Sequence, residues 1–207
     1  MTPPFRWNER AGRFIDRAGR FVARSVVVGA LDGALERSRE AIGDLRLALR
    51  DGRISLAAWQ QGMATELRMG HLAAAATARG GWGQLTVADL RHVEGIVTEQ
   101  LTFLRRFAGQ IASGEQPLNG ILLRRAELYA LMPRMTQHEM ERLESLRLGF
   151  DEERNMLAAS EHCQGCISET ERDWVPIGTL VAIGARDCLS KCRCSISYRN
   201  SATDARR

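Results

Sequence analysis

The sequence predicts a mainly α-helical fold: a helical bundle preceded by a basic N-terminal arm and followed by a small C-terminal β module. Three observations predict it. Apolar residues recur at steps of three and four over most of residues 25–149, which is the period of an amphipathic helix. Arginines dominate residues 1–24. All five cysteines lie within residues 150–207, beside β-prone segments, so this last part is expected to be a separate cysteine-rich module.

The overall composition is that of an ordinary globular protein. Of 207 residues, 44% are hydrophobic and 26% are charged, so a disordered chain is not expected. The apolar run at residues 26–28 is far too short to span a bilayer, and we expect a soluble protein with no membrane partner. The net charge is +4, but acidic residues nearly match arginines in number, so the charge alone does not predict a nucleic-acid partner.

The arm is basic and carries a turn signal. Asp16 and Gly19 occupy the first and fourth places of a type I turn between apolar pairs, which favours a hairpin or an extended arm. Two interpretations stay open: a solvated tail that orders only against a partner, and an arm whose aromatic residues contact a neighbouring subunit while its arginines face acidic protein or DNA. The arginines in question are Arg6, Arg10, Arg13, Arg17, Arg20 and Arg24.

Three long helices are predicted first in the bundle. An apolar seam predicts one over residues 28–51, which ends at a glycine. Ser55 is the expected N-cap of the second, over residues 55–80. Thr86 is the expected N-cap of the third, over residues 86–113, and each of these helices carries one apolar stripe that would face its neighbours.

Two shorter helices follow. The fourth is expected over residues 122–131 and is halted by Pro133. Thr136 and Glu139 have the spacing of a capping box, so they predict the start of a last helix that ends at Gly149.

No catalytic motif is recognisable. The chain has no P-loop, no dinucleotide-binding glycine pattern, no nucleophile elbow and no His-Glu-x-x-His motif. His71, His92 and His138 are far apart in the sequence, so we expect ordinary surface or interhelical histidines. We therefore expect no enzymatic activity and no small-molecule substrate.

The cysteines form a metal-binding pattern. Cys163 and Cys166 make a Cys-x-x-Cys knuckle, and Cys188, Cys192 and Cys194 follow in a second cluster. Two thiolates at the knuckle spacing can bind one tetrahedral ion that the second cluster completes, so we expect one structural zinc ion. The alternative is a pair of disulfides, against which we set the odd number of cysteines and the lack of a recognisable signal peptide.

The ligand set is only partly fixed by the spacing. Cys163, Cys166 and Cys188 are expected to supply three ligands. Either Cys192 or Cys194 supplies the fourth, since both thiols of an extended Cys-Arg-Cys strand point to the same face. The longer gap after Cys188 favours Cys194.

The C-terminal block also resembles a known family. It runs through Arg154-Asn155, the knuckle, a Trp/Pro/Gly turn at residues 174–178, and the final Cys-Arg-Cys at residues 192–194. This order is similar to the C-terminus of phage Mu F-like head morphogenesis (minor head) proteins and covers the last third of the chain. Many members carry His-Pro-x before the final Cys-Arg-Cys. Here that place reads Leu-Ser-Lys, and Cys188 just upstream is a candidate replacement for the histidine.

The resemblance implies a minor structural protein of a tailed-bacteriophage head. Such a protein would dock to the capsid or portal in several copies, act in head assembly in the host cytoplasm and reside in the virion. The alternative is a nucleic-acid-binding zinc module, motivated by the knuckle and the basic arm. Acids offset bases within residues 163–194, which argues against that alternative.

Overall fold

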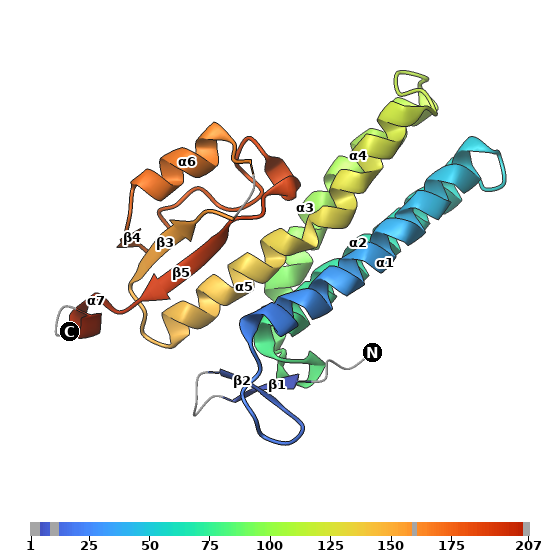
Figure 1. Ribbon diagram of the computed structural model, residues 1–207. Helices are drawn as coiled ribbons and strands as arrows, with labels where there is room; N and C mark the ends of the chain where they lie inside the picture. The colour runs from blue at the N-terminus through green and yellow to red at the C-terminus, as the bar shows by residue number, and fades with distance from the viewer. Residues whose placement is uncertain (1–4, 9–12, 159–160, 205–207) are drawn as a thin grey trace.

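The computed structural model describes residues 5–8, 13–158 and 161–204 of the chain. It is mainly helical with two small antiparallel sheets, which confirms the predicted fold class at this level. Figure 1 shows a bundle of long helices with a hairpin beneath its lower end and a C-terminal α/β module against its side. Within the described residues, no helix is both long enough and apolar enough to cross a membrane.

Three long helices form most of the bundle: α1 (Arg24–Arg50), α2 (Leu56–Arg79) and α3 (Val87–Ala112). The two predicted N-caps are confirmed. The Ser55 hydroxyl accepts the N–H of the first turn of α2 at 3.1 Å. Thr86 forms a reciprocal capping box at the start of α3. Both caps satisfy backbone N–H groups that have no partner inside the helix.

Helices α4 (Gly120–Leu131) and α5 (Pro133–Arg147) follow one another almost without a break, because Met132 between them has helical backbone angles of φ −55° and ψ −34°. The prediction that Thr136 opens the last helix is wrong. Helix α5 begins at its proline, which needs no hydrogen-bonded N–H at the first position. Thr136 lies inside α5 and is fully buried.

Helix α2 occupies the centre of the bundle and packs against α1, α3 and α5. Two of its glycines allow close contact: a Cβ at Gly62 would meet the Leu45 side chain at 2.6 Å, and one at Gly70 would meet the Pro133 ring at 2.7 Å. The main core is aromatic and aliphatic, and its largest buried side chains are Trp59, Phe107, Ile42, Met63, Leu67, Leu104 and Leu122.

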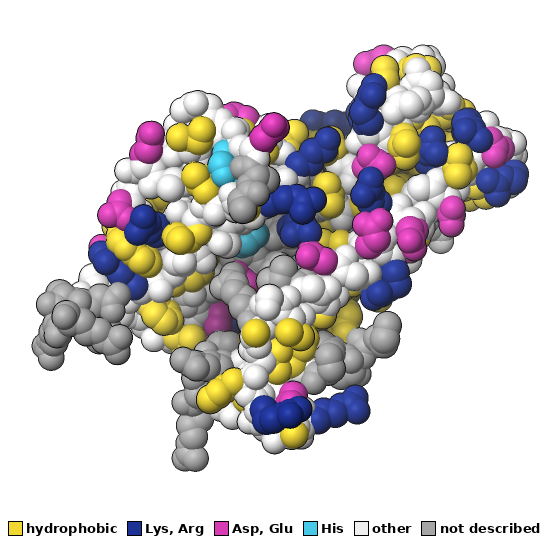
Figure 2. Space-filling view, viewed as in Figure 1, with side chains coloured by type: hydrophobic (Ala, Val, Ile, Leu, Met, Phe, Trp, Pro, Cys, Tyr) yellow, Lys and Arg dark blue, Asp and Glu magenta, His cyan; other side chains and the backbone are white. Residues whose placement is uncertain are grey.

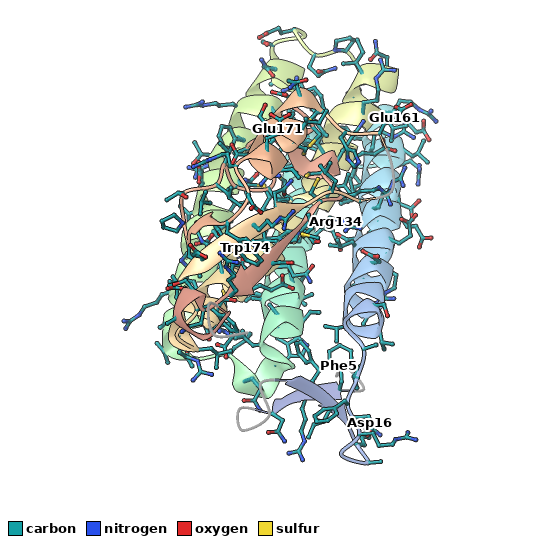
Figure 3. The ribbon with its side chains drawn as sticks, turned by 60° about the vertical axis from the view of Figure 1, so that its left-hand side comes forward. Phe5, Asp16, Arg134, Glu161, Glu171 and Trp174 are labelled. Carbon is teal, nitrogen blue, oxygen red and sulfur yellow. The ribbon has the colours of Figure 1, made fainter. Side chains whose placement is uncertain are left out.

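The arm forms a hairpin from β1 (Phe5–Asn8) and β2 (Arg13–Asp16). After β2 the chain makes the predicted turn: Asp16 Oδ1 accepts the N–H of the residues two and four places on, and Gly19 has φ +80°. Figure 3 shows Phe5 on this hairpin under the helix ends. Arg6, Arg17 and Arg20 are exposed, whereas Arg10 and the side chains of Arg13 and Arg24 lie outside the described part of the chain.

The C-terminal module is built on a small sheet. Its central strand β3 (Glu152–Met156) pairs along its length with β5 (Ser195–Arg199) and over two residues with β4 (Val175–Pro176). The remaining elements of the module are α6 (Gln164–Glu171), the short 3-10 helix η2 (Leu189–Lys191) and α7 (Ser201–Asp204).

The module is seated on the last two helices of the bundle, since η2 contacts α4 and β5 contacts α5. Gly184 makes the closest approach: it has φ +97°, and a Cβ there would overlap the side chain of Met135 on α5. The division at residues 149 and 150 between bundle and module stays a prediction.

Candidate metal centre

The Cys163–Cys166 knuckle lies at the N-terminus of α6. Cys163 is the N-cap of α6, and its Sγ accepts the backbone N–H of Cys166 at 3.4 Å. This N–H bond to sulfur fixes the Cys163 side chain at the start of the helix. The local fold therefore positions the first ligand before any ion is considered.

The sulfur atoms stand at the separation expected of ligands that share one ion. Cys166 Sγ lies 3.6 Å from Cys188 Sγ and 3.5 Å from Cys192 Sγ. Two thiolates on a tetrahedral zinc ion at Zn–S of about 2.3 Å would lie about 3.8 Å apart. A disulfide would need about 2.05 Å, and all five cysteines are free in the structure.

All five sequence-predicted ligands meet in one cluster. Cys163, Cys166 and Cys188 have mutual sulfur separations within 4.8 Å, as have Cys166, Cys192 and Cys194. Cys166 belongs to both groups and is therefore the centre of the cluster. A hollow of about 310 Å³ opens over it, lined also by Glu161, His162, Lys191 and Arg193.

The other three cysteines, Cys188, Cys192 and Cys194, lie beside η2 and β5. Cys188 precedes η2, Cys192 ends it, and Cys194 immediately precedes β5. Cys166, Cys192 and Cys194 are buried, and burial raises the pKa of the Cys188 thiol to about 11 and that of the Cys192 thiol as well. Without a cation these two thiols stay protonated near neutral pH, so a metal ion would displace their protons on binding.

Sequence reasoning missed the polar network behind the cysteines. Asn155, fully buried on β3, donates its amide to the carbonyl oxygen of Cys166 at 3.1 Å and to Thr170 Oγ1 at 2.6 Å. Its Oδ1 accepts from Arg186 Nη1 at 2.7 Å. In the sequence, Asn155 is marked only by the family resemblance, and Arg186 is one of several bases within residues 163–194.

Arg186 lies directly against the thiols. Its Nη1 is 3.8 Å from Cys166 Sγ, and its Nε donates to the carbonyl of Val181 at 2.8 Å. The residue is only 3% exposed. Within the described part of the chain, its Nη2 has no hydrogen-bond partner and no carboxylate forms an ion pair with it.

Two buried carboxylates hold the loop that carries the Trp/Pro/Gly turn. Glu153 Oε1 accepts the N–H groups of Gly178 and Leu180 at 2.9 and 3.0 Å. Glu169 Oε2 accepts the N–H of Val181 at 3.0 Å. Both acids bind backbone far away in the sequence, so no local pattern could have identified them.

The bundle histidines lie outside this cluster. His71 is fully buried between α2 and α5, with Nδ1 2.7 Å from Thr136 Oγ1, and burial lowers its pKa to about 4. His92 on α3 and His138 on α5 are half-buried and lie 3.8 Å from Glu139 and Glu141 respectively.

The five clustered cysteines could together hold a metal ion. Comparisons with known protein families, with curated proteins and with solved structures find no match to this chain.

Proposed function

We propose that the cysteine cluster binds one structural zinc ion through Cys163, Cys166, Cys188 and Cys192. The observation that carries this proposal is the placement of Cys166 at 3.6 and 3.5 Å from two sulfurs that come from a different part of the chain. Cys192 is preferred as the fourth ligand because its Sγ lies 3.5 Å from Cys166 Sγ, the separation expected of two thiolates on one ion.

Zinc would supply folding free energy that the module otherwise lacks. Its buried core consists of Leu180, Ile183 and Ile196 together with buried cysteines. So small a core does not stabilise a fold by itself. Zinc bound by four thiolates contributes roughly 10 kcal/mol or more in small domains.

The fourth ligand can be tested with a matched pair of variants. Cys192→Ser is expected to lower zinc affinity at least about tenfold, because a ligand is lost. Cys194→Ser is the control, with the same change of atom two residues further along the chain, and is expected to keep one equivalent of zinc. Competition with a chromophoric chelator measures both. The reverse order would assign the fourth position to Cys194.

We propose further that the chain is a minor structural protein of a tailed-phage head, a component of the virion that is assembled in the host cytoplasm. Support comes from the residues that carry the resemblance, which form one connected unit. Asn155 binds the knuckle at Cys166, and Arg154 pairs at 3.1 Å with Asp173, next to the Trp/Pro/Gly turn.

Docking to the capsid or portal in several copies fits this architecture. Repeated weak interfaces can hold a protein firmly in a symmetric shell. On the face shown in Figure 2, basic and acidic side chains are interspersed along the long helices, without the extended basic stripe that a nucleic-acid-binding face presents.

Mass spectrometry of purified heads and of head-assembly intermediates tests this role. The proposal predicts the chain in both samples at a constant ratio to the portal protein. Its absence from both would contradict a structural role in the head.

A further inference from the structure

The strongest unexplained feature outside the ligands is the buried guanidinium of Arg186. It is 3% exposed, and no carboxylate in the described residues neutralises it. Arginine does not lose its proton in proteins, so the fold buries a full positive charge here. A buried charge without a counter-charge is strongly unfavourable.

Among the residues that the structure describes, the group nearest to the guanidinium that can carry negative charge is a cysteine sulfur. Arg186 Nη1 lies 3.8 Å from Cys166 Sγ, the thiol at the centre of the cluster. The guanidinium cannot turn away, because Asn155 Oδ1 holds Nη1 at 2.7 Å and the Val181 carbonyl holds Nε at 2.8 Å.

We infer that Arg186 is the counter-charge of the metal centre and determines its affinity for dications held by four thiolates. This inference rests on the proposed zinc site. Four thiolates and one dication leave a net charge of about −2 by the ordinary charges of these groups. One buried guanidinium offsets half of it, and Asn155 fixes the guanidinium in place while also binding the carbonyl of Cys166.

Two substitutions distinguish the effect of the Arg186 charge on metal affinity from the effect of its side-chain shape. Arg186→Gln removes the charge and is expected to weaken Co²⁺ or Zn²⁺ binding by about 10- to 100-fold, the range for groups that support metal ligands. Arg186→Lys keeps the charge and is expected to stay within about tenfold of the unchanged protein. Arg172→Gln is the matched control: it removes one positive charge from a partly exposed site in the same module and is expected to change affinity by no more than about threefold.

Bound Co²⁺ has an absorption band whose wavelength depends on the charge near the sulfur ligands and would not change through packing alone. The sulfur-to-cobalt charge-transfer band should shift to longer wavelength in Arg186→Gln, because sulfur electrons are easier to remove when the adjacent positive charge is gone. Arg186→Lys should leave the band close to its original position. Equal weakening by Gln and Lys, or an unshifted band in Arg186→Gln, would overturn the inference.

The outcomes separate the two proposals. If the unchanged protein takes up no cobalt under reducing conditions, the zinc site itself fails. If it binds cobalt through four thiolates and Arg186→Gln binds equally well, only the role of Arg186 fails. Should Arg186→Gln not fold, Arg186→Lys still decides, since a loss beyond about tenfold with the charge retained contradicts a counter-charge.

Discussion

At the scale of single residues, Asn155 is the point where sheet, knuckle and loop meet. Its side chain makes hydrogen bonds to Cys166, Thr170 and Arg186 without any exposure to solvent. An amide is well suited to this position, since it both donates and accepts. Neither a hydrophobic residue nor a charged one could satisfy all three partners.

Asn155→Ala is therefore expected to destabilise the zinc-loaded protein by about 3 kcal/mol, because Nη1 of the buried Arg186 loses its acceptor and the carbonyl of Cys166 loses one of its donors. Urea unfolding followed by tryptophan fluorescence measures the change. Gln164→Ala, an exposed residue on α6, is the control and is expected to remain within about 0.5 kcal/mol. Equal effects of the two substitutions would show that the network contributes little.

His71 predicts a pH dependence of the bundle. Its folded-state pKa of about 4 lies below the ordinary value of 6.5, so between these two pH values only the unfolded state takes up the proton. The free energy of unfolding should then fall as the pH falls from about 6.5 to 4, by at most about 1.4 kcal/mol per pH unit. His71→Gln should flatten the stability curve in this window. Parallel curves for the two proteins would contradict burial of a neutral histidine.

The cysteine cluster could be predicted at this scale, and its surroundings could not. Cys163 and Cys166 are three residues apart in the sequence, and this spacing is typical of metal-binding cysteines. Arg186, Glu153 and Glu169 bind groups brought together only by the fold, and in the sequence they are charges like any others.

At the scale of elements, the crossing of α2 and α5 depends on one glycine. Gly70 on α2 lies where the Pro133 ring of α5 comes close to the α2 backbone. The next residue of α2, His71, contacts Thr136 of α5. Close approach of the two helices thus brings α5, and with it the attached module, against the centre of the bundle.

Gly70→Ala is expected to destabilise the protein by about 1–3 kcal/mol, since the added methyl group overlaps a rigid ring. The control is Gly95→Ala on α3, where a Cβ meets nothing within 4 Å. That change should stabilise by up to about 1 kcal/mol from helix propensity alone. Thermal unfolding measures both, and stabilisation by Gly70→Ala would contradict the close crossing.

Element starts were predictable where the signal is local. Ser55 and Thr86 cap their helices through neighbours three residues on. The start of α5 was not predictable in this way, because Pro133 and Thr136 both give valid start signals. The helix begins at Pro133, and Thr136 is buried inside it against His71 of α2. This contact joins residues far apart in the sequence, so no local pattern predicts it.

At the scale of the whole molecule, bundle and module differ in what stabilises them. The bundle has a large core of apolar side chains on α1 to α4, whereas the module has a few apolar residues around its cysteines. Loss of the metal should therefore lower the stability of the module and leave that of the bundle unchanged.

Cys166→Ser is expected to release zinc and abolish hydrogen-exchange protection of amides in residues 152–199, while the helices over residues 24–147 keep theirs. Cys194→Ser serves as the control and should keep both parts protected. Loss of protection throughout the chain would mean that the bundle also depends on the ion.

Elemental analysis of the protein, purified under reducing conditions without chelator, tests whether the cysteine cluster binds zinc. We expect one zinc ion per chain, bound through thiolates that no longer react with a thiol reagent until a chelator is added. Less than about a tenth of an equivalent of zinc, together with intact disulfides by mass, would contradict it.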